Sequence, residues 1–292
     1  MASHFASSEL IINEDGSIFH LHIRPEQLAH KVVLVGDPGR VSLVASHFDE
    51  VECDITSREF HTMTGTYKGK RITCLSHGIG CDNIDIVMNE LDALVNIDFT
   101  SRTEKFELTS LELVRVGTCG GLQPYTPTGT FVCSEKSIGF DGLLNYYAGR
   151  DAVCDLAFEE NFKAYMDWSP RKGSPYVIDN CAELLDRICA DDPRMVRGVT
   201  IAAGGFFGPQ GRELRIPLQD PRQNEKVMAY EYNGYRITNF EMESSALAGL
   251  AALLGHRAMT CCMVVANRVA KEANTGYKNT IDELIVRVLD RI

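Results

Sequence analysis

Short apolar runs rich in valine and isoleucine alternate along the chain with segments in which apolar residues recur at helical spacing. The runs have the length of buried strands, whereas the second pattern is typical of helices with one apolar face. The runs predict strands over Lys31–Val35, Arg71–Ser76, Leu111–Val116, Thr130–Ser134, Val199–Ala203, Tyr235–Asn239 and Arg257–Val265. The helical spacing predicts helices over Arg40–His47, Ile84–Leu94, Ala182–Ala190, Ser244–Leu254 and Ile281–Ile292. This alternation predicts an α/β fold.

No internal repeat, low-complexity segment or linker interrupts the pattern, so we expect one domain over residues 1–292. Residues 1–16 lack the basic and apolar parts of a signal peptide and are expected to be a flexible segment. The last helix is expected to begin with a capping box formed by Thr280 and Glu283. Residues 141–176 are polar and aromatic without a clear period, and they are expected to hold a helix and a surface excursion.

The charge and the cysteines narrow the class of protein. The formal net charge is −11, which argues against nucleic acid or an anionic membrane as a partner, because both require a positive field. No apolar run approaches the roughly 20 residues of a membrane span. Most of the ten cysteines lie in apolar runs and none forms a CxxC pair, so buried reduced thiols and a cytoplasmic setting are expected. Cys261 and Cys262, adjacent on one predicted strand, are expected to point to opposite faces.

Several predicted strands end in glycine-rich or polar clusters: Gly36–Arg40, His77–Gly80, Gly117–Gly121 and Gly204–Phe207. Open α/β sheets bind their ligands at the carboxyl ends of the strands. The sequence therefore marks the edge of the sheet at which a site is expected.

Two of these clusters carry arginines suited to an anion. The turn Gly36–Arg40 combines a close backbone approach with a cation at a helix start, although a tight turn with a solvated arginine is the alternative. Arg115 lies in an otherwise apolar run, before Gly117 and Thr118. A buried arginine needs an anionic partner, which is either a bound oxyanion or a structural Asp or Glu. Taken alone, Arg58 and Glu59 read as an ordinary surface pair.

Two further segments suit a sugar and a planar base. Glu241 and Glu243 flank Met242 where a strand meets a helix; either they cap the helix, or a carboxylate binds the vicinal hydroxyls of a sugar. In the loop Phe206–Arg212, an aromatic ring precedes Gln210, whose amide matches the N3–H and O4 of uracil. Arg212 could then stabilise the charge on a departing base. The alternative is a loop with exposed polar tips.

Two nucleotide-binding patterns are absent or incomplete. Gly78–Asn83 follows a strand like a dinucleotide fingerprint, but Asn83 replaces the third glycine. No glycine precedes Lys-Ser or Lys-Thr at the spacing of a P-loop. We therefore expect no cofactor.

Taken together, the segments resemble the nucleoside phosphorylase family, in particular its uridine phosphorylase type. The matching pieces occur in the family's order and are Phe19–Leu21, Gly36–Arg40, Ser57–Phe60, Gly78–Gly80, Arg115–Thr118, Phe206–Arg212, Glu241–Ser244 and Asn267–Arg268. The resemblance implies a mixed, partly closed sheet flanked by helices, and a pentosyltransferase that splits uridine or deoxyuridine with phosphate in pyrimidine salvage.

The resemblance also implies a role for each matching residue. Phosphate would be held by Gly36, Arg40, Arg115 and Thr118, with Arg58 from a neighbouring subunit. The ribose would be held by Met242, Glu243 and the neighbour's His20, and the base by Phe206, Gln210, Arg212 and Arg268. Of these residues, Arg115, Gln210 and Arg212 would act most directly in catalysis. No side chain need be a covalent nucleophile.

Two departures from the family pattern concern an ion and the assembly. Some members bind a monovalent cation between subunits; Glu59 and Ile79 match its ligands, but Asn83 replaces a serine, so no metal is assigned. The stretch Ile97–Ser110 is longer and more charged than the family pattern, which could turn a hexamer into a dimer.

Two rival interpretations remain open. A purine nucleoside phosphorylase or nucleosidase on the same scaffold would place an Asp near Asn267, where this chain reads Val265–Arg268 without a carboxylate. A non-catalytic nucleoside or sugar-phosphate sensor could use the same contacts.

Overall fold

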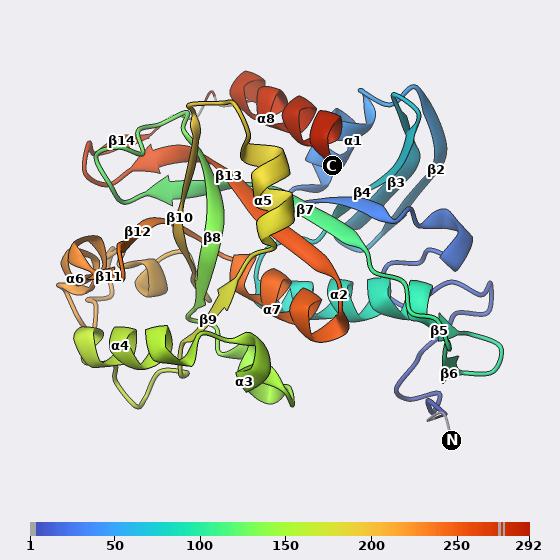
Figure 1. Cartoon of the computed structure of the whole chain (residues 1–292), viewed down its shortest axis with the longest axis horizontal. Helices are drawn as coiled ribbons and strands as arrows, with labels where there is room; N and C mark the ends of the chain where they lie inside the picture. Colours follow the sequence, from blue (N-terminus) through green and yellow to red (C-terminus); the bar gives the residue numbers. More distant parts are fainter. Residues whose placement is uncertain (1–3, 274–275, 277) are drawn as a thin grey trace.

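The computed structural model of the chain describes residues 4–273, 276 and 278–292 (Figure 1). In this described part, twelve strands form one sheet, and two more form a separate hairpin. The sheet strands are β1 (Lys31–Val35), β2 (Glu50–Ser57), β3 (Phe60–Tyr67), β4 (Lys70–Ser76), β7 (Glu112–Gly121), β8 (Phe131–Gly139), β9 (Tyr176–Asp179), β10 (Met195–Ala202), β11 (Glu231–Tyr232), β12 (Tyr235–Glu241), β13 (Arg257–Asn267) and β14 (Glu272–Ala273). The hairpin strands are β5 (Ile97–Asp98) and β6 (Thr103–Glu104). The helices are α1 (Pro38–Ala45), α2 (Cys81–Asn96), α3 (Arg150–Val153), α4 (Leu156–Met166), α5 (Ala182–Cys189), α6 (Gln223–Ala229), α7 (Ser244–Leu254) and α8 (Lys278–Arg291).

Five strands of the sheet close into a barrel. β7 pairs with β13, β13 with β8, β8 with β10, and β10 with β12. β12 then returns to β7, where Asn239 lies opposite Gly121 and Phe240 opposite Gly120. Beyond β7 the sheet continues openly through β1, β4, β3 and β2, with parallel and antiparallel pairs mixed. The predicted mixed, partly closed sheet is therefore confirmed.

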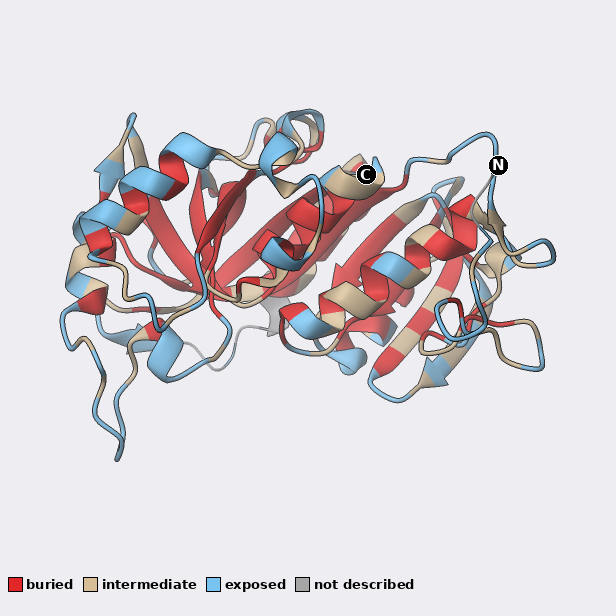
Figure 2. Cartoon of the chain, turned by 90° about the horizontal axis from the view of Figure 1, so that it is seen from below, coloured by how far each residue is buried: buried red, intermediate tan, exposed pale blue. Residues whose placement is uncertain are grey.

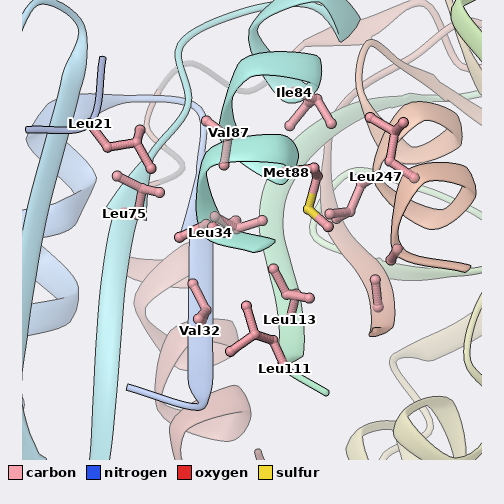
Figure 3. Packing of buried hydrophobic residues seen from close by; sticks show 14 of the residues in the cluster. Leu21, Val32, Leu34, Leu75, Ile84, Val87, Met88, Leu111, Leu113 and Leu247 are labelled. Carbon is pink, nitrogen blue, oxygen red and sulfur yellow. The ribbon is translucent and has the colours of Figure 1, made fainter. Parts of the chain in front are cut away.

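The apolar strands are covered on both faces by helices. Val32 and Leu34 of β1 belong to a core cluster with residues of α2 and α7, as Figure 3 shows. Val33 and Val35 belong to a second cluster with residues of α1, α5 and α8 on the opposite face. Figure 1 shows these two groups of helices on opposite sides of the sheet, and Figure 2 shows the buried strands between helices with exposed outer faces. Burying one such side chain contributes about 1.5–3 kcal/mol.

The predicted elements are all present, although several of their ends differ from the prediction. The strand over Lys31–Val35 and the helix over Ser244–Leu254 have the predicted bounds. β7 runs on to Gly121 because its glycines pair in the barrel and do not form a loop. α1 begins earlier than predicted, at Pro38, because Asp37 is its N-cap and accepts a hydrogen bond from Gly39 N at 2.9 Å.

The predicted capping box of the last helix is wrong. α8 begins at Lys278, so Thr280 lies inside its first turn and cannot be the N-cap. The structure also contains a hairpin, β2–β3, that the apolar pattern did not indicate. The residues of β2 are half-buried or exposed, and Glu50, Glu52 and Asp54 alternate along it. Residues 141–176 hold α3 and α4 and lead into β9, in agreement with the expected helix.

All ten cysteines are free thiols in the structure, seven of them buried. Cys261 Sγ lies 3.4 Å from Cys133 Sγ on one face of β13. Cys262 Sγ lies 3.4 Å from Nη1 of Arg115 on the other face. The expectation that the two neighbouring cysteines point to opposite faces is confirmed.

The N-terminal segment is tied to the hairpin of β5 and β6. Arg102 donates from its guanidinium to the carbonyls of Phe5, at 2.9 Å, Ala6, at 3.2 Å, and Leu10. Leu10 is buried, with 5% of its surface exposed. One arginine of the charged stretch Ile97–Ser110 thus satisfies three backbone acceptors of residues 4–16.

Candidate active site

One cavity of about 710 Å³ opens at the carboxyl ends of β1, β4 and β7 and at the junction of β12 and α7. Most of the predicted site residues line it, namely Gly36, Arg40, Glu59, Ile79, Arg115, Thr118, Phe206, Gln210, Arg212, Met242 and Glu243. The three arginines Arg40, Arg115 and Arg212 therefore face a single cavity. They come from segments far apart in the sequence, and the sheet order brings them together.

Arg40 projects from the first turn of α1. Only 9% of it is exposed, and its Nη1 donates to the carbonyl of Val116 at 3.3 Å. Gly117 follows in β7, where a Cβ atom would come within 2.8 Å of Arg115 Nη1. Thr118 lines the cavity one residue further on. The turn after β1 and the middle of β7 thus supply two cations and a hydroxyl to the same wall.

Arg115 is enclosed by carboxylates. Its Nη1 lies 2.9 Å from Oε2 of Glu241, and its Nη2 donates to Oε2 of Glu243. Only 4% of Arg115 is exposed. Burial alone would lower the pKa of Arg115, but Glu243 and Glu241 raise it above its usual value. The structural ion pair that the sequence left open as an alternative is therefore present, on a residue that also lines the cavity.

Glu241 and Glu243 differ in their contacts: Glu241 caps a helix, and Glu243 does not. Glu241 caps α7, since its carboxylate accepts from Glu243 N at 2.9 Å and from Ser244 N and Oγ at 3.0 and 2.6 Å. Glu243 makes no capping bond; its Oε1 instead accepts from Gly80 N at 2.7 Å. Burial raises the pKa of Glu243, and Arg115 opposes that rise. The helix-capping interpretation therefore holds for Glu241, and Glu243 remains available to the cavity.

His77 is a buried residue of the site that the sequence did not single out. Its Nε2 accepts from Nε of Arg115 at 3.2 Å, and its side chain is fully buried. Because arginine has no acceptor, Nε2 must be unprotonated and the proton must sit on Nδ1. Burial lowers the pKa of His77 well below its usual 6.5, and Arg115 and Arg40 lower it further. The only sequence signal was its place at a strand end, in the cluster His77–Gly80.

The neutral state of His77 predicts a loss of stability in acid. Below the unfolded pKa of 6.5, the unfolded chain binds a proton at His77 that the folded chain does not bind. The free energy of unfolding should therefore fall by about 1.4 kcal/mol per pH unit below pH 6.5 from this residue alone. Denaturant titrations of the wild type and His77→Gln between pH 7 and 5 measure this contribution. The exposed His30→Gln is the control, and parallel wild-type and His77→Gln curves would contradict the prediction.

The loop Phe206–Arg212 is held in place by its own side chains. Arg212 donates from Nη1 to the side-chain carbonyl of Gln210 and to Phe206 O, the latter at 2.6 Å. Its guanidinium carbon lies 3.7 Å from the ring centroid of Phe206. Asn224 of α6, which the sequence did not indicate, donates to the carbonyls of Gln210 and Gly211 at 3.2 and 3.1 Å. The loop therefore presents Gln210 and Arg212 to the cavity as one unit.

Arg268 lies beside this unit but does not line the cavity. Its Nη1 donates to Gly211 O at 3.5 Å, while its buried Nε and Nη2 have no hydrogen-bond partner among the described residues. Burial and the neighbouring Arg268 lower the pKa of Arg212 to about 10. Within the part of the chain that the structure describes, no carboxylate pairs with either cation, so this end of the cavity is suited to negative charge.

Two further predicted site residues, His20 and Arg58, do not line the cavity either. His20 Nδ1 lies 2.6 Å from Oε1 of Glu90 on α2. Arg58 occupies the β2–β3 turn with a φ of 56°, and its guanidinium carbon lies 5.6 Å from the ring centroid of Phe19. The two residues are thus joined through Phe19, whose ring centroid is 4.7 Å from that of His20.

A profile of the phosphorylase superfamily matches residues 30–290 of the chain. The chain belongs to the phosphorylase superfamily. Within its described residues, no helix combines the length and the apolar character needed to cross a bilayer.

Relatives of this phosphorylase cover nearly its whole length. A uridine phosphorylase of Thermococcus kodakarensis is 30% identical over 283 residues, 93% of this chain and 85% of that protein. A DeoD-type purine nucleoside phosphorylase of Bacillus subtilis is 27% identical over 90% of this chain and 91% of its own. A solved nucleoside phosphorylase of Trypanosoma brucei, described as showing uridine phosphorylase activity, matches at 28% identity with a TM-score of 0.86 and covers 97% of this chain and 100% of that one.

These matches confirm the family, the fold and a pentosyltransferase enzyme. They support nucleoside phosphorolysis, the reaction of a nucleoside with phosphate. Because uridine and purine nucleoside phosphorylases both occur among the relatives, they do not decide which base this phosphorylase accepts.

Proposed function

We propose that this phosphorylase cleaves uridine, and also deoxyuridine, with inorganic phosphate to uracil and ribose or deoxyribose 1-phosphate. The observation that carries the proposal is the Gln210–Arg212 unit, which shares one cavity with Arg40 and Arg115. In the sheet, β12 and β7 lie between β10, which leads to that unit, and β1, which leads to Arg40. Pyrimidine salvage in the cytoplasm is the setting we propose.

Phosphate binds at the wall formed by the β1–α1 turn and β7. Gly36 lets the backbone approach the anion, and Arg40 and Thr118 contact its oxygens. Arg115 contributes a cation whose position is set by Glu241 and Glu243. These local charges act against the overall net charge of −11.

Ribose binds beside the start of α7. Glu243 accepts hydrogen bonds from the 2′ and 3′ hydroxyls, and Met242 packs against the apolar side of the ring. Both residues line the cavity, and the short bond from Gly80 N fixes the carboxylate of Glu243.

The reaction needs charge stabilisation on both sides of C1′, at the attacking phosphate and at the departing base. A phosphate oxygen forms a bond to C1′ while the C1′–N1 bond breaks, and its electron pair leaves with the base. Gln210 and Arg212 bind the edge of uracil and stabilise its developing anion, with Arg268 behind them. Holding both reactants in one cavity removes most of the entropic cost of their encounter.

A purine nucleoside phosphorylase is the second candidate, because a relative of that name matches at 27% identity. A purine nucleoside phosphorylase would require a carboxylate near Asn267 to bind N7 of the purine. Here Val265 and Ala266 line the cavity. Asn267 is buried, and its amide donates to the carbonyls of Gln123 and Thr126 at 3.0 and 2.7 Å. Glu272, opposite Asn267 across the β13–β14 pairing, is exposed and does not line the cavity. Among the described residues, neither a carboxylate nor a free amide therefore lies beside Val265 and Ala266 at this wall.

We infer that a second copy of the chain completes the site. His20 and Arg58 do not line the cavity of their own chain, although the family resemblance gives them ribose and phosphate contacts. The pair is held together through Phe19, so one surface could deliver both residues to a neighbour. A homodimer is the smallest assembly with complete sites.

The base can be tested directly with three substrates. Purified full-length protein is incubated with uridine, inosine or methylthioadenosine, with and without phosphate, and the free base is measured by chromatography. We expect uracil only when phosphate is present, and base release from the purine nucleosides slower by about a hundredfold or more, because polar mismatch at the base is strongly rejected. Faster purine release, or base release without phosphate, would contradict the proposal.

A further inference from the structure

A second cavity, of about 760 Å³, lies next to the first and shares the side chain of Arg212 with it. Phe206 lines the first cavity and the adjacent Phe207 lines the second, so the loop forms a wall between them. The volume falls in the range of about 300–1,000 Å³ that is typical of small-molecule sites. The phosphorolysis proposed above uses no residue of this second cavity except Arg212.

Aromatic and aliphatic side chains form most of its walls. The rings of Phe140 and Trp168 meet edge to face with centroids 4.7 Å apart. Phe207, Leu214 and Ile216 line the same space and are 51%, 77% and 82% exposed. Large apolar side chains gathered around one hollow and left in water indicate a surface that another group covers.

The charges around this cavity are predominantly positive. Lys172 and Arg215 line it together with Arg212. Its one acidic lining residue, Asp220, lies 2.7 Å from Lys226 and is neutralised by it. Across the described residues, Arg215 makes no hydrogen bond or ion pair with any group. In a chain with a net charge of −11, these unneutralised cations beside apolar walls favour an anion.

Lys172 is a cation of this cavity that also contacts its aromatic wall. Its Nζ lies 4.8 Å from the ring centroid of Trp168 and donates to Oε1 of Gln223 at 3.2 Å. Gln223 in turn donates to Pro209 O at 2.9 Å, immediately before Gln210. A ligand beside Lys172 would thus contact the back of the loop whose front binds the base.

We propose that this cavity binds a small planar aromatic anion, with its rings between Trp168 and Phe207 and its charge on Arg215 and Lys172. The rings match the apolar walls, and the charge matches the excess of cations. The site is separate from the nucleoside cavity, and its occupant is neither substrate nor product of the proposed reaction.

Trp168 provides a direct readout, because it is the one tryptophan of the chain. The full-length protein is titrated with 8-anilino-1-naphthalenesulfonate, a planar aromatic anion that accepts energy from tryptophan. We expect a saturable loss of Trp168 emission with a matching rise in probe emission. The uncharged N-phenyl-1-naphthylamine, which has the same rings, should bind about tenfold more weakly because it cannot pair with the cations.

Variants test which cations of the cavity bind the negative charge of the probe. Arg215→Gln and Lys172→Gln should each weaken binding of the sulfonate probe about threefold to fivefold and leave binding of the uncharged probe unchanged. Arg236→Gln is the matched control, because Arg236 is an exposed arginine paired with Glu231 and lines neither cavity. These readouts do not depend on turnover, so they stand whether or not the chain cleaves uridine.

Four outcomes would overturn the proposal. Probe binding without loss of Trp168 emission would locate the probe elsewhere, and displacement by uracil would locate it in the nucleoside cavity. Equal affinity for the charged and uncharged probes would show that the cations do not contribute to binding. If no probe binds and Leu214→Ser with Ile216→Ser lowers the oligomeric state in sedimentation, a second copy of the chain covers this face instead.

Discussion

Arg212→Ala is expected to lower kcat/KM for uridine phosphorolysis by about a hundredfold or more, corresponding to about 2.7–4 kcal/mol of lost transition-state stabilisation. The guanidinium is half-buried, stacks on Phe206 and orients the amide of Gln210. Its removal would take away the charge that we propose stabilises the departing uracil, and it would also free Gln210. Steady-state kinetics at saturating phosphate measure the effect, and near-normal turnover would refute the assigned role.

The leaving group provides a sharper form of this test. Fluorine at C5 makes uracil more acidic, so the departing base needs less stabilisation by the protein. The loss caused by Arg212→Ala should therefore be smaller with 5-fluorouridine than with uridine. Arg236→Ala, which removes an exposed arginine outside the cavity, should leave both rates unchanged. Equal losses on the two substrates would show that Arg212 holds the loop but does not stabilise the leaving base.

Arg115→Met is expected to reduce both activity and stability. It leaves Glu241 and Glu243 buried, 3% and 4% exposed, without their cation. Removing one partner from such a buried cluster costs about 3–5 kcal/mol. Turnover should fall by about a hundredfold or more, because phosphate loses a cation and Glu243 loses its position. Denaturant titration and phosphorolysis assays at one pH measure the two effects.

A second variant separates these two losses. Arg115→Met combined with Glu243→Gln removes one of the orphaned charges, so part of the lost stability should return while activity stays low. Arg236→Met, at an exposed ion pair, should change stability by no more than about 1 kcal/mol. If the double variant is no more stable than Arg115→Met, uncompensated burial of Glu243 is not the cause of the loss.

The sequence predicted best where one physical rule decides the local structure. β1 is apolar from Val32 to Val35 because both faces are covered there, and α7 has sharp ends because Glu241 satisfies its first amides and Gly255, at a φ of 78°, ends it. The cavity lining was also largely predictable, since parallel strands bring their carboxyl ends to one edge.

Features that depend on distant partners were not visible in the sequence. The hairpin β2–β3 has a polar, exposed outer strand, so its apolar pattern is weak. His77 and Asn224 matter through bonds to Arg115 and to the carbonyl of Gln210, which only the folded chain brings within reach. Likewise, Arg115 could be assigned to an oxyanion or to a carboxylate from sequence alone, because both choices place it in the same apolar run.

The closed barrel has a consequence for how this protein can diverge. β7 and β12, which lie beside the proposed phosphate and ribose contacts, are paired with neighbours on both sides, so a change there disturbs several pairings at once. The loop Phe206–Arg212, which we propose binds the base, instead connects elements and is anchored by bonds from α6 and Arg268. Substitutions in that loop can therefore retune the choice of nucleobase while the sugar-phosphate machinery is inherited intact.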